Sequence, residues 1–474
     1  MTIIVWLRQD LRVADNPALH EAAKHGPVLP VFILEPDDQP GLKHPIGGAS
    51  RWWLHQSLTA LSKDLNGLSV FHGDPQEILL GLAKRHEAAA VYWNRLYDPH
   101  AVKRDTAIKK ALKDDGFEAE SFKGCVLFEP WEIETKTGGP YKVYTPFWRA
   151  AKAAGVGAPL KRPEALEVVA DEDSLAIADL NLLPAKPDWA KGWLDIWSPG
   201  EAGARQRLEA FFADGLDGYG DKRNRPDLPN VSRLSPHLHH GEISPRQVWA
   251  ATRHLCDDKP SFEDDADKFL SELVWREFSY HLLFHFPTLP EENWKDAFNA
   301  YPWRFSENDL KAWQKGKTGY PIVDAGMREL WQTGYMHNRV RMIAASFLVK
   351  HLRMHWHHGE DWFWDTLVDA DLASNSASWQ WVAGSGADAS PYFRIFNPMT
   401  QGEKFDPEGD YIRKWVPELK DLDTAYIHAP FEAPDKALIK AGIKLGDTYP
   451  EPIVDHKTAR EAALAGYEKV KSAN

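Results

Sequence analysis

The sequence predicts two folded parts, an α/β N-terminal domain with a parallel, Rossmann-like sheet and an all-α C-terminal domain. Three observations support this fold class. With 474 residues, the chain is too long for a single hydrophobic core. Its first ~130 residues alternate strand-like and helix-like segments, which is typical of a parallel sheet with helices on its faces. From about residue 202 to about residue 382 the hydrophobic pattern is mainly helical.

Short runs of β-branched and aromatic residues mark the expected strands of the N-terminal domain. Asn16 and Pro17 indicate a helix start, because asparagine caps well and proline fits the first helical position. The first strand is not followed by G-x-G-x-x-G, so the usual dinucleotide fingerprint is missing. We expect strands at residues 3–6, 28–34, 68–71, 89–93 and 117–122, and helices at 52–65, 75–86 and 99–114.

A stretch rich in Gly, Pro, Ala and charged residues separates the two parts. We therefore expect an α/β domain at residues 1–131, a connector at 132–199 and a helical domain at 200–474. A short helix is expected inside the connector at residues 146–154. In the helical domain we expect helices at 204–212, 245–254, 266–286, 323–334 and 338–356.

Composition and charge narrow the class of protein. The two cysteines, Cys125 and Cys256, suit a reducing cytoplasm better than a disulfide scaffold. No apolar run approaches the ~20 residues of a membrane span, and the N-terminus does not read as a secretory signal. We therefore expect a cytoplasmic protein without a membrane partner. The net charge of −13 argues mildly against nucleic acid, although basic clusters at 222–225, 339–341 and 350–353 allow a basic groove.

The segment 271–278 places three different functional groups on one helical face. Glu272, Trp275 and Arg276 have i, i+3, i+4 spacing. A carboxylate, an indole and a guanidinium together suit a flat, anionic ligand with polar edges, such as a base or a flavin. The alternative is an amphipathic helix with an internal salt bridge, and the motif alone favours that alternative.

Two further segments carry polar groups that suit a ligand. Asn338 can bond a base edge and Arg339 a phosphate, while Met342 offers a soft apolar surface one turn later. The alternative for this segment is a surface-exposed polar helix start. Residues 369–381 are expected to form a loop rich in small residues between helices. Its carboxylates could bind a metal, but no His or Cys ligand spacing accompanies them, and Asp and Asn side chains also suit cofactor hydroxyls and ring nitrogens.

The histidines and two absent motifs exclude several classes of function, whereas the tryptophans allow two interpretations. The histidines at 355–358 and 281–285 match no strong zinc pattern, so we predict no metal site. G-x-S-x-G and Walker A sequences are absent, which removes the commonest hydrolases and nucleotide triphosphatases. Most of the 21 tryptophans are expected to serve packing. Indole can also pass an electron to a photo-oxidant, and this second interpretation concerns Trp303, Trp356, Trp379 and Trp381.

Together these motifs resemble the DNA photolyase and cryptochrome family. The resemblance runs from residues 3–12 to 413–415 and is densest at 317–325, 379–381 and 392–398. It implies an α/β antenna domain, a connector and an all-helical domain that holds a bent FAD. It also implies a light-driven lyase that repairs cyclobutane pyrimidine dimers in UV-damaged DNA. Excited FADH⁻ would give an electron to a flipped-out dimer, which splits and returns the electron.

The resemblance implies a role for residues in each motif. Trp275 would stack on the thymine rings, Glu272 would stabilise the anionic dimer, and Asn375 would lie beside the reactive nitrogen of the flavin. The hydroxyls of Ser232 and Ser235 suit a pyrophosphate. The implied FAD contacts are Tyr219, Val231, Ser232, Arg233, Leu234, Ser235, Arg341, Asp369, Ala370, Asp371 and Asn375. The implied DNA and lesion contacts are Glu272, Trp275, Arg276, Asn338, Arg339, Met342, Trp381, Arg394 and Gln401, and the implied electron relay is Trp379, Trp356 and Trp303.

Three positions favour cyclobutane-dimer repair over the functions of other branches of the family. Enzymes for (6-4) photoproducts are expected to carry two His at i, i+4, where this chain has Asn338 and Met342, neither of which can act as an acid. Plant-type sensory cryptochromes are expected to carry an acid where this chain has Asn375. The alternatives are a blue-light receptor that binds FAD without repair and, less favoured, a redox flavoprotein without DNA binding.

The resemblance also implies a second, antenna chromophore. Methenyltetrahydrofolate is the first expectation and a deazaflavin the second. Residues 94–101 depart from the pattern, because they lack the Asn-Glu pair expected of folate-binding bacterial members. Ser378 is a smaller departure, since many relatives have glycine before the tryptophan at 379. We expect the protein to be a monomer.

Overall fold

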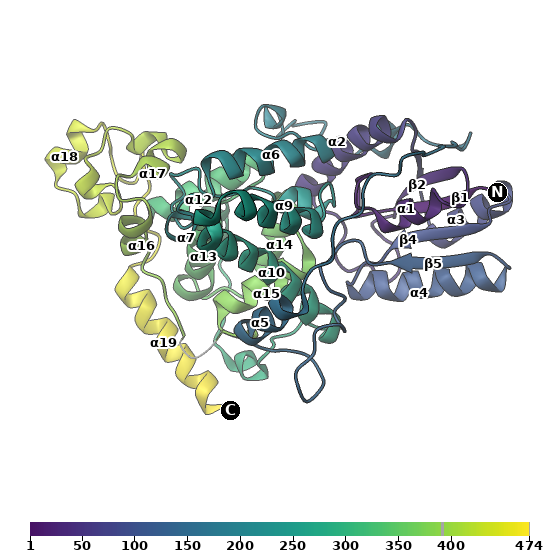
Figure 1. Cartoon of the computed structure of the whole chain (residues 1–474). Coiled ribbons are helices and arrows are strands. Elements are labelled where there is room, and N and C mark those ends of the chain that lie inside the picture. The colour runs from purple at the N-terminus through teal and green to yellow at the C-terminus, as the bar shows by residue number, and fades with distance from the viewer. Residues whose placement is uncertain (390–392, 474) are drawn as a thin grey trace. The chain divides into compact units, whose positions relative to one another are not determined.

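The computed structural model describes residues 1–389 and 393–473, which form two compact units (Figure 1). Each unit draws on segments that lie far apart in the sequence. Unit 1 consists of Met1–Asp217, Ser232–Pro287 and Val368–Ala373. Unit 2 consists of Gly218–Val231, Thr288–Leu367 and Ser374–Asn474. The domain boundaries after residues 131 and 199 stay predictions.

Unit 1 begins with a five-stranded parallel sheet in the order β3-β2-β1-β4-β5, which confirms the predicted α/β fold class. Every residue of β1 and β2 is buried, as expected of parallel strands with helices on both faces. The strands are β1 (Ile3–Leu7), β2 (Val28–Leu34), β3 (Ser69–His72), β4 (Ala90–Asn94) and β5 (Glu118–Phe122), and the helices between them are α1 (Pro17–Ala22), α2 (Gly48–Leu65), α3 (Pro75–Arg85) and α4 (Pro99–Asp114).

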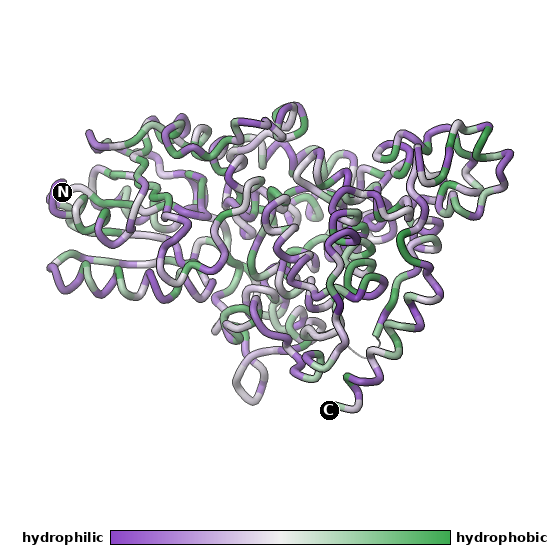
Figure 2. The backbone as a smooth tube through the Cα atoms, turned by 180° about the vertical axis from the view of Figure 1, so that it is seen from behind, coloured by the Kyte–Doolittle hydropathy of each residue, from purple (hydrophilic) through white to green (hydrophobic). Residues whose placement is uncertain are grey.

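The two faces of the sheet bury alternate side chains of the same strand. Ile3, Val5 and Leu7 of β1 pack in one cluster with α1 and α2. Ile4 and Trp6 belong to the opposite cluster, which includes α3 and α4. Figure 2 shows hydrophobic and hydrophilic residues alternating along the turns of α4, as expected of a helix with one face on the sheet. Burial of each large apolar side chain contributes roughly 1.5–3 kcal/mol to the stability of the fold. Because a shift by one residue would expose these side chains, the alternation fixes which face of the sheet each residue occupies.

The first helix begins as the sequence predicts. Asn16 accepts a hydrogen bond from the main-chain N–H of Leu19 at 3.1 Å, and Pro17 is the first helical residue. The N-cap therefore satisfies one of the donors that a helix start leaves without an intrahelical partner.

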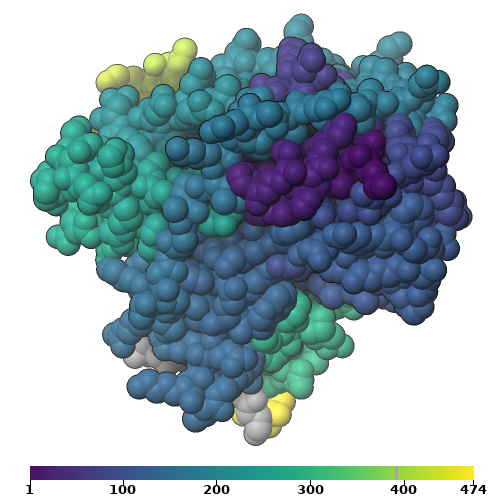
Figure 3. All heavy atoms as spheres, turned by 45° about the vertical axis from the view of Figure 1, so that its right-hand side comes forward, coloured from purple at the N-terminus to yellow at the C-terminus, as the bar shows by residue number. Residues whose placement is uncertain are grey.

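The segment after β5 contains the predicted connector helix, which begins two residues earlier than expected. Beyond it, the chain runs beside the N-terminal residues, where the N–H of Asp15 donates to the carbonyl of Leu160 at 3.0 Å and Val28 bridges to Val168. Figure 3 shows this blue strip next to the purple N-terminal residues. The helices of this part of unit 1 are α5 (Tyr144–Ala154), α6 (Glu201–Asp214), α8 (Ser235–His239), α9 (Pro245–Asp258) and α10 (Glu263–His285), with 3₁₀ helices η1 (Ile177–Leu180), η2 (Trp193–Asp195) and η3 (Pro260–Phe262).

Unit 2 is largely helical over its described residues, as predicted for the C-terminal half. None of the helices in residues 1–389 and 393–473 is long and apolar enough to cross a membrane. The helices of unit 2 outside the corrected segments below are α7 (Tyr219–Lys222), α11 (Glu307–Gln314), α12 (Pro321–Thr333), α16 (Pro398–Phe405), α17 (Asp410–Trp415), α18 (Asp435–Lys440) and α19 (His456–Ser472), with 3₁₀ helices η4 (Asp296–Ala300), η6 (Pro417–Leu419), η7 (Thr424–Tyr426) and η8 (Pro430–Glu432).

The single helix predicted at residues 338–356 is wrong. Arg353 adopts a left-handed φ of +53°, and the extended His355 accepts a hydrogen bond from the N–H of His357 as the cap of a new helix. Neither proline nor glycine marks this break, so the periodic pattern continues through it. The segment forms α13 (Asn338–Ser346), the π-helix η5 (Phe347–His351) and α14 (Trp356–Thr366).

The loop predicted at residues 369–381 is also wrong, because most of it is helix α15 (Leu372–Ala383). Asn375, Ser376, Trp379, Gln380 and Ala383 are buried, and their spacing places them on one helical face. Ser and Asn are poor residues for a helix interior in isolation, because they compete for main-chain hydrogen bonds. Their tertiary contacts, described below, outweigh this preference.

Candidate functional site

Helix α10 carries the three predicted residues of the 271–278 motif. Glu272, Trp275 and Arg276 are all half-buried, so each side chain keeps an accessible part. Lys268 forms an ion pair with Glu272 at 2.9 Å, and Arg276 forms one with Glu277 at 3.3 Å. The three side chains thus lie on one helix, where Glu272 and Arg276 each form an ion pair with another residue of that helix.

A buried network in unit 1 holds Asp371 as a carboxylate. The hydroxyl of Tyr280 donates to Asp371 Oδ2 at 2.5 Å, and the Arg276 guanidinium lies 4.6 Å from the Tyr280 ring. Nδ1 of His239 lies 3.9 Å from the same Asp371 oxygen. Burial raises the pKa of Asp371, but the interaction with His239 and the charge of Arg276 outweigh burial and hold this pKa below its ordinary value. Asp371 is thus a charged acceptor in a buried position.

The turn before α8 groups hydroxyls with a carboxylate and a cation. Ser235 Oγ donates to Asp369 Oδ2 at 2.5 Å, and the N–H of Leu234 donates to Ser232 Oγ at 3.4 Å. Arg233 lies between the two serines in the sequence and has a left-handed φ of +53°. The hydroxyls and the cation could bind the anionic part of a ligand, and the carboxylate could accept hydrogen bonds from its hydroxyl groups.

The other predicted cofactor contacts lie on several elements. Tyr219 is buried at the start of α7, and Val231 is half-buried. Ala370 is buried between the two aspartates of its motif. On α13, Arg341 Nε donates to the carbonyl of Met336 at 2.7 Å, which fixes the direction of the guanidinium.

The side chain of Asn375 on α15 is fixed by α14. Asn375 Nδ2 donates to the carbonyl oxygen of Glu360 at 3.1 Å, and Ser376 Oγ donates to Glu360 Oε1 at 2.5 Å. Burial raises the pKa of Glu360 to about 8 and outweighs the hydrogen bond from Ser376, which lowers it. The sequence gave no sign of this contact between Glu360 and the 369–381 motif.

Of the three tryptophans predicted to form an electron relay, Trp356 and Trp379 are buried in unit 2 and Trp303 is half-buried. Trp379 packs on Gly359 so closely that a Cβ there would lie 2.0 Å from the indole. Trp356 is the first residue of α14, three positions before that glycine. The ring of His355 lies 5.0 Å from the ring of Trp303 and 5.4 Å from that of Trp356. The ring of His355 thus lies between those of Trp303 and Trp356, while Trp379 packs on the same helix, α14.

Trp356 donates its indole N–H to a buried amide that the sequence did not single out. The acceptor is Asn293 Oδ1 at 2.9 Å, and Asn293 Nδ2 donates in turn to Asn299 Oδ1 at 2.8 Å. Both asparagines line an open hollow of about 580 Å³ with His355, His357, His358, Glu291, Glu292 and Asp296. In the described part of the chain, no three His, Cys, Asp or Glu side chains are arranged to hold a metal ion.

Asn338, Arg339 and Met342 lie in the first half of α13. Asn338 is its first residue and is exposed, while Met342 is half-buried one turn later. Arg339 Nη2 donates to Asn224 Oδ1 at 2.8 Å, and its guanidinium lies 4.5 Å from the ring of Phe405. The side chain of Asn338 is therefore accessible to a ligand.

The last three predicted lesion contacts also lie in unit 2. Trp381 and Arg394 line one small hollow, and the guanidinium lies 5.9 Å from the indole. Gln401 is half-buried on α16. Tyr392, which belongs to one of the dense motifs, falls outside the described residues.

Comparisons with known proteins identify the family of the chain. The family model described as DNA photolyase matches residues 3–164, and the model described as the FAD binding domain of DNA photolyase matches residues 269–469. The chain is 56% identical to the deoxyribodipyrimidine photo-lyase of Agrobacterium fabrum over 99% of this chain and 98% of that protein. The chain belongs to the DNA photolyase family. It is also 39% identical to cryptochrome-1 of Arabidopsis thaliana, over 95% of this chain and 68% of that protein.

Solved structures of the photolyase family share the fold. The structure of a class III photolyase from Agrobacterium tumefaciens matches with a TM-score of 0.95 and 55% identity, over 99% of this chain and 98% of that one. A cryptochrome from Synechocystis matches with a TM-score of 0.88 and 28% identity, over 98% of each chain. The chain therefore has the α/β and helical architecture of this family, including its FAD-binding domain.

The polar side chains at the predicted cofactor positions of this photolyase-family chain fit FAD chemically. Ser232, Arg233 and Ser235 offer two hydroxyls and a cation, which suit a pyrophosphate. Asp369 and the charged Asp371 are acceptors for ribityl or ribose hydroxyls and ring N–H groups. The cofactor would supply the light absorption and electron transfer that no amino-acid side chain provides.

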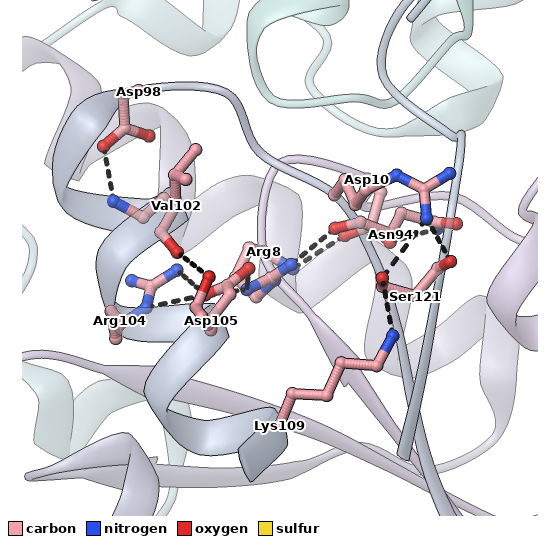
Figure 4. A network of polar contacts seen from close by, with 12 residues as sticks. Arg8, Asp10, Asn94, Asp98, Val102, Arg104, Asp105, Lys109 and Ser121 are labelled. Carbon is pink, nitrogen blue, oxygen red and sulfur yellow. Dashed lines mark hydrogen bonds and ion pairs between the residues drawn. The ribbon is translucent and has the colours of Figure 1, made fainter. Parts of the chain in front are cut away.

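The α/β sheet has its switch point at β1 and β4, where the strand order reverses. Ligands of open parallel sheets usually bind at the carboxyl ends of the strands at such a point. At this point side chains of the chain itself form a network of polar contacts (Figure 4). Asn94 Nδ2 donates to Asp10 Oδ2 at 2.6 Å, and Arg8 Nη1 pairs with Asp105 Oδ2 at 3.0 Å. A Cβ at Gly124 would lie 2.4 Å from Asn94, so the packing leaves no space there.

Proposed function

We propose that the protein is a deoxyribodipyrimidine photo-lyase, which uses light to split cyclobutane pyrimidine dimers in UV-damaged DNA. The observation that carries the proposal is the 56% identity to a protein of that name over nearly the full length of both chains. Reduced FAD, when bound, supplies the photo-excited electron that reaches a flipped-out dimer. The protein binds both partners, orients them and keeps water away from them.

The FAD would be held by the residues that the motifs single out. Ser232, Arg233 and Ser235 would bind the pyrophosphate, and Asp371 would accept from hydroxyl or ring N–H groups. Because Asn375 Nδ2 is occupied by the carbonyl of Glu360, its Oδ1 is the end that would face the reactive flavin nitrogen. The remaining FAD contacts in the proposal are Tyr219, Val231, Leu234, Arg341, Asp369 and Ala370.

The lesion would be recognised by stacking and by charge. Trp275 would stack on the thymine rings, and Glu272 and Arg276 would bond the polar edges of the dimer. Asn338 is exposed at the start of α13, which supports a contact with a base edge. The further DNA contacts in the proposal are Arg339, Met342, Trp381, Arg394 and Gln401. Trp379, Trp356 and Trp303 would deliver electrons that keep the flavin reduced.

The side chains at two positions select the cyclobutane dimer within the proposal. Asn338 and Met342 supply no proton, so the acid chemistry expected for a (6-4) lesion has no donor there. A second candidate function is a blue-light receptor without repair. The 39% identity to a plant cryptochrome favours it, whereas the amide of Asn375 at the position of the expected acid disfavours it.

An antenna chromophore is part of the proposal, with methenyltetrahydrofolate expected first and a deazaflavin second. Arg8, Asp10, Asn94 and Asp105 form polar contacts at the β1–β4 switch point, where ligands of open parallel sheets usually bind. A family member from Sulfolobus tokodaii is described as holding two FAD molecules, which adds a third candidate. The absorption spectrum of the purified protein distinguishes these chromophores. We further propose that the protein acts on DNA in the cytoplasm as a monomer, with an α/β domain at 1–131, a connector at 132–199 and a helical domain at 200–474.

The direct test is illumination of the reduced protein with an oligonucleotide that contains one cyclobutane thymine dimer. Loss of the dimer in the light, and not in the dark, is the expected result. Binding of FAD without any light-dependent loss would favour the receptor instead. Repair of a (6-4) photoproduct in a parallel reaction would contradict the interpretation of Asn338 and Met342.

A further inference from the structure

A near-parallel stack of two aromatic rings in unit 1 includes Trp275, one of the proposed lesion contacts. The rings of Tyr144 and Trp275 have centroids 3.6 Å apart and planes inclined by only 10°. Aromatic pairs in proteins more often lie edge to face or at larger separations. One face of the Trp275 indole is therefore covered by a phenol ring from α5, and Trp275 is still half-buried rather than buried.

Tyr144 is itself held in place from two sides. Its hydroxyl donates to the carbonyl oxygen of Ser271, which lies one helical turn before Trp275 on α10. Phe278 contacts both rings edge-on, with centroids 5.9 Å from each. Tyr144 is buried and forms the first residue of its helix. The phenol is thus a fixed surface against which the indole lies.

We propose that Tyr144 is a positioning residue that sets the plane of Trp275 for stacking on a flipped-out pyrimidine dimer, an inference that rests on the proposed function. With one face covered, Trp275 can offer only its other face and its edge to a base. The stack also removes rotational freedom from the indole before the ligand binds, and such preorganisation raises affinity. Tyr144 contributes to recognition of the damaged site without contacting it.

The test compares Tyr144→Leu, which removes the stack, with Tyr144→Phe, which keeps the ring and removes only the hydroxyl. Binding to duplexes with and without one cyclobutane dimer is measured for each variant, after FAD content and thermal unfolding show that it is folded. Tyr144→Leu should weaken binding to the damaged duplex by about 3- to 10-fold, the effect of losing one aromatic pair. Binding to the undamaged duplex should not change, and Tyr144→Phe should lose less than Tyr144→Leu.

Trp148→Leu is the matched control, because Trp148 lies on the same helix and packs on Trp249, at 6.3 Å between ring centroids. It should leave damage-specific binding unchanged. The double variant Tyr144→Leu/Trp275→Ala then separates positioning from general stability. If Tyr144 acts through Trp275, the double variant binds the damaged duplex no more weakly than Trp275→Ala alone.

Additive losses in the double variant would overturn the proposal, as would equal losses for damaged and undamaged duplexes. Unchanged binding by Tyr144→Leu would also overturn it. The unsubstituted protein is tested for repair first, so a failure of the proposed function is recognised before any variant is compared.

Discussion

The amide of Asn375 donates to the main-chain carbonyl of Glu360 at 3.1 Å, which ties α15 to α14. This bond determines which end of the amide is available to a ligand, because only a nitrogen can donate to a carbonyl. The carboxyl group of the same Glu360 accepts from Ser376. One residue of α14 thus fixes two neighbouring side chains of the helix that the sequence suggested was a loop.

Asn375→Asp should damage repair more than it damages folding. An aspartate oxygen would replace Nδ2 opposite the Glu360 carbonyl, and repulsion between the two oxygens favours protonation of the new acid. A titratable acid would then replace the amide proposed to lie beside the flavin. We expect light-dependent repair to fall about tenfold, or roughly 1.4 kcal/mol. A changed flavin spectrum under illumination would accompany the loss of repair. The control is Ser376→Ala, which leaves the hydrogen bond from the Asn375 amide to Glu360 in place.

Glu360→Gln should remove a pH dependence of stability. The pKa of Glu360 rises from an ordinary value of 4.5 to about 8, so the folded state binds its proton more tightly than the unfolded state. Protonated Glu360 therefore adds its full contribution to the free energy of unfolding below about pH 4.5, and this contribution is lost as the pH rises through about 8. The unfolding temperature should therefore decline less from pH 5 to pH 9 in Glu360→Gln than in the unsubstituted protein. Parallel pH profiles for the two proteins would contradict this assignment.

Gly359→Ala should displace the buried Trp379. The new Cβ would meet the indole at 2.0 Å, and both groups are buried, so neither can move freely. We expect a destabilisation of about 1–3 kcal/mol, typical of overpacking, together with slower photoreduction of the flavin. Gly81→Ala on α3 is the matched control, because nothing lies within 4 Å of its Cβ position. That control should be neutral or slightly stabilising in thermal unfolding.

Trp303→Phe should slow photoreduction of the oxidised flavin by about tenfold or more, since phenylalanine is a poor electron donor. Repair by protein that was chemically reduced beforehand should be unchanged. Trp131→Phe, at an exposed tryptophan outside the proposed relay, should affect neither measurement. If repair collapsed in the pre-reduced Trp303→Phe protein, the relay role would be wrong.

Asn293→Leu should leave the buried indole N–H of Trp356 without its acceptor at 2.9 Å. An unsatisfied buried donor costs about 1–3 kcal/mol, so the unfolding temperature should fall. Photoreduction should slow as well, because the hydrogen bond stabilises the positive charge that develops on the indole when it gives up an electron. Asn293→Asp retains an acceptor and should preserve photoreduction. Equal rates for the Leu variant and the unsubstituted protein would exclude this role of Asn293.

Local sequence patterns were sufficient for the N-terminal half. Alternating strands and helices, with caps such as Asn16 before Pro17, produced the α/β fold and strand bounds within one residue at each end. In the helical half, the i, i+3, i+4 spacing on α10 placed Glu272, Trp275 and Arg276 together, because side chains on one helix follow its period. Motif strings then identified the family.

Tertiary structure decided what depends on residues far apart in the sequence. The polar segment 372–383 is helical because Glu360, from another helix, bonds Asn375 and Ser376. Residues 338–356 break because of backbone conformations at Arg353 and His355 that no glycine or proline announces. The covering of Trp275 by Tyr144 likewise joins residues 131 positions apart. The sequence by itself determined the family, the class of cofactor and which residues share a helical face. Packing between elements decided which of those side chains are buried, which are held in one orientation and which have a shifted pKa.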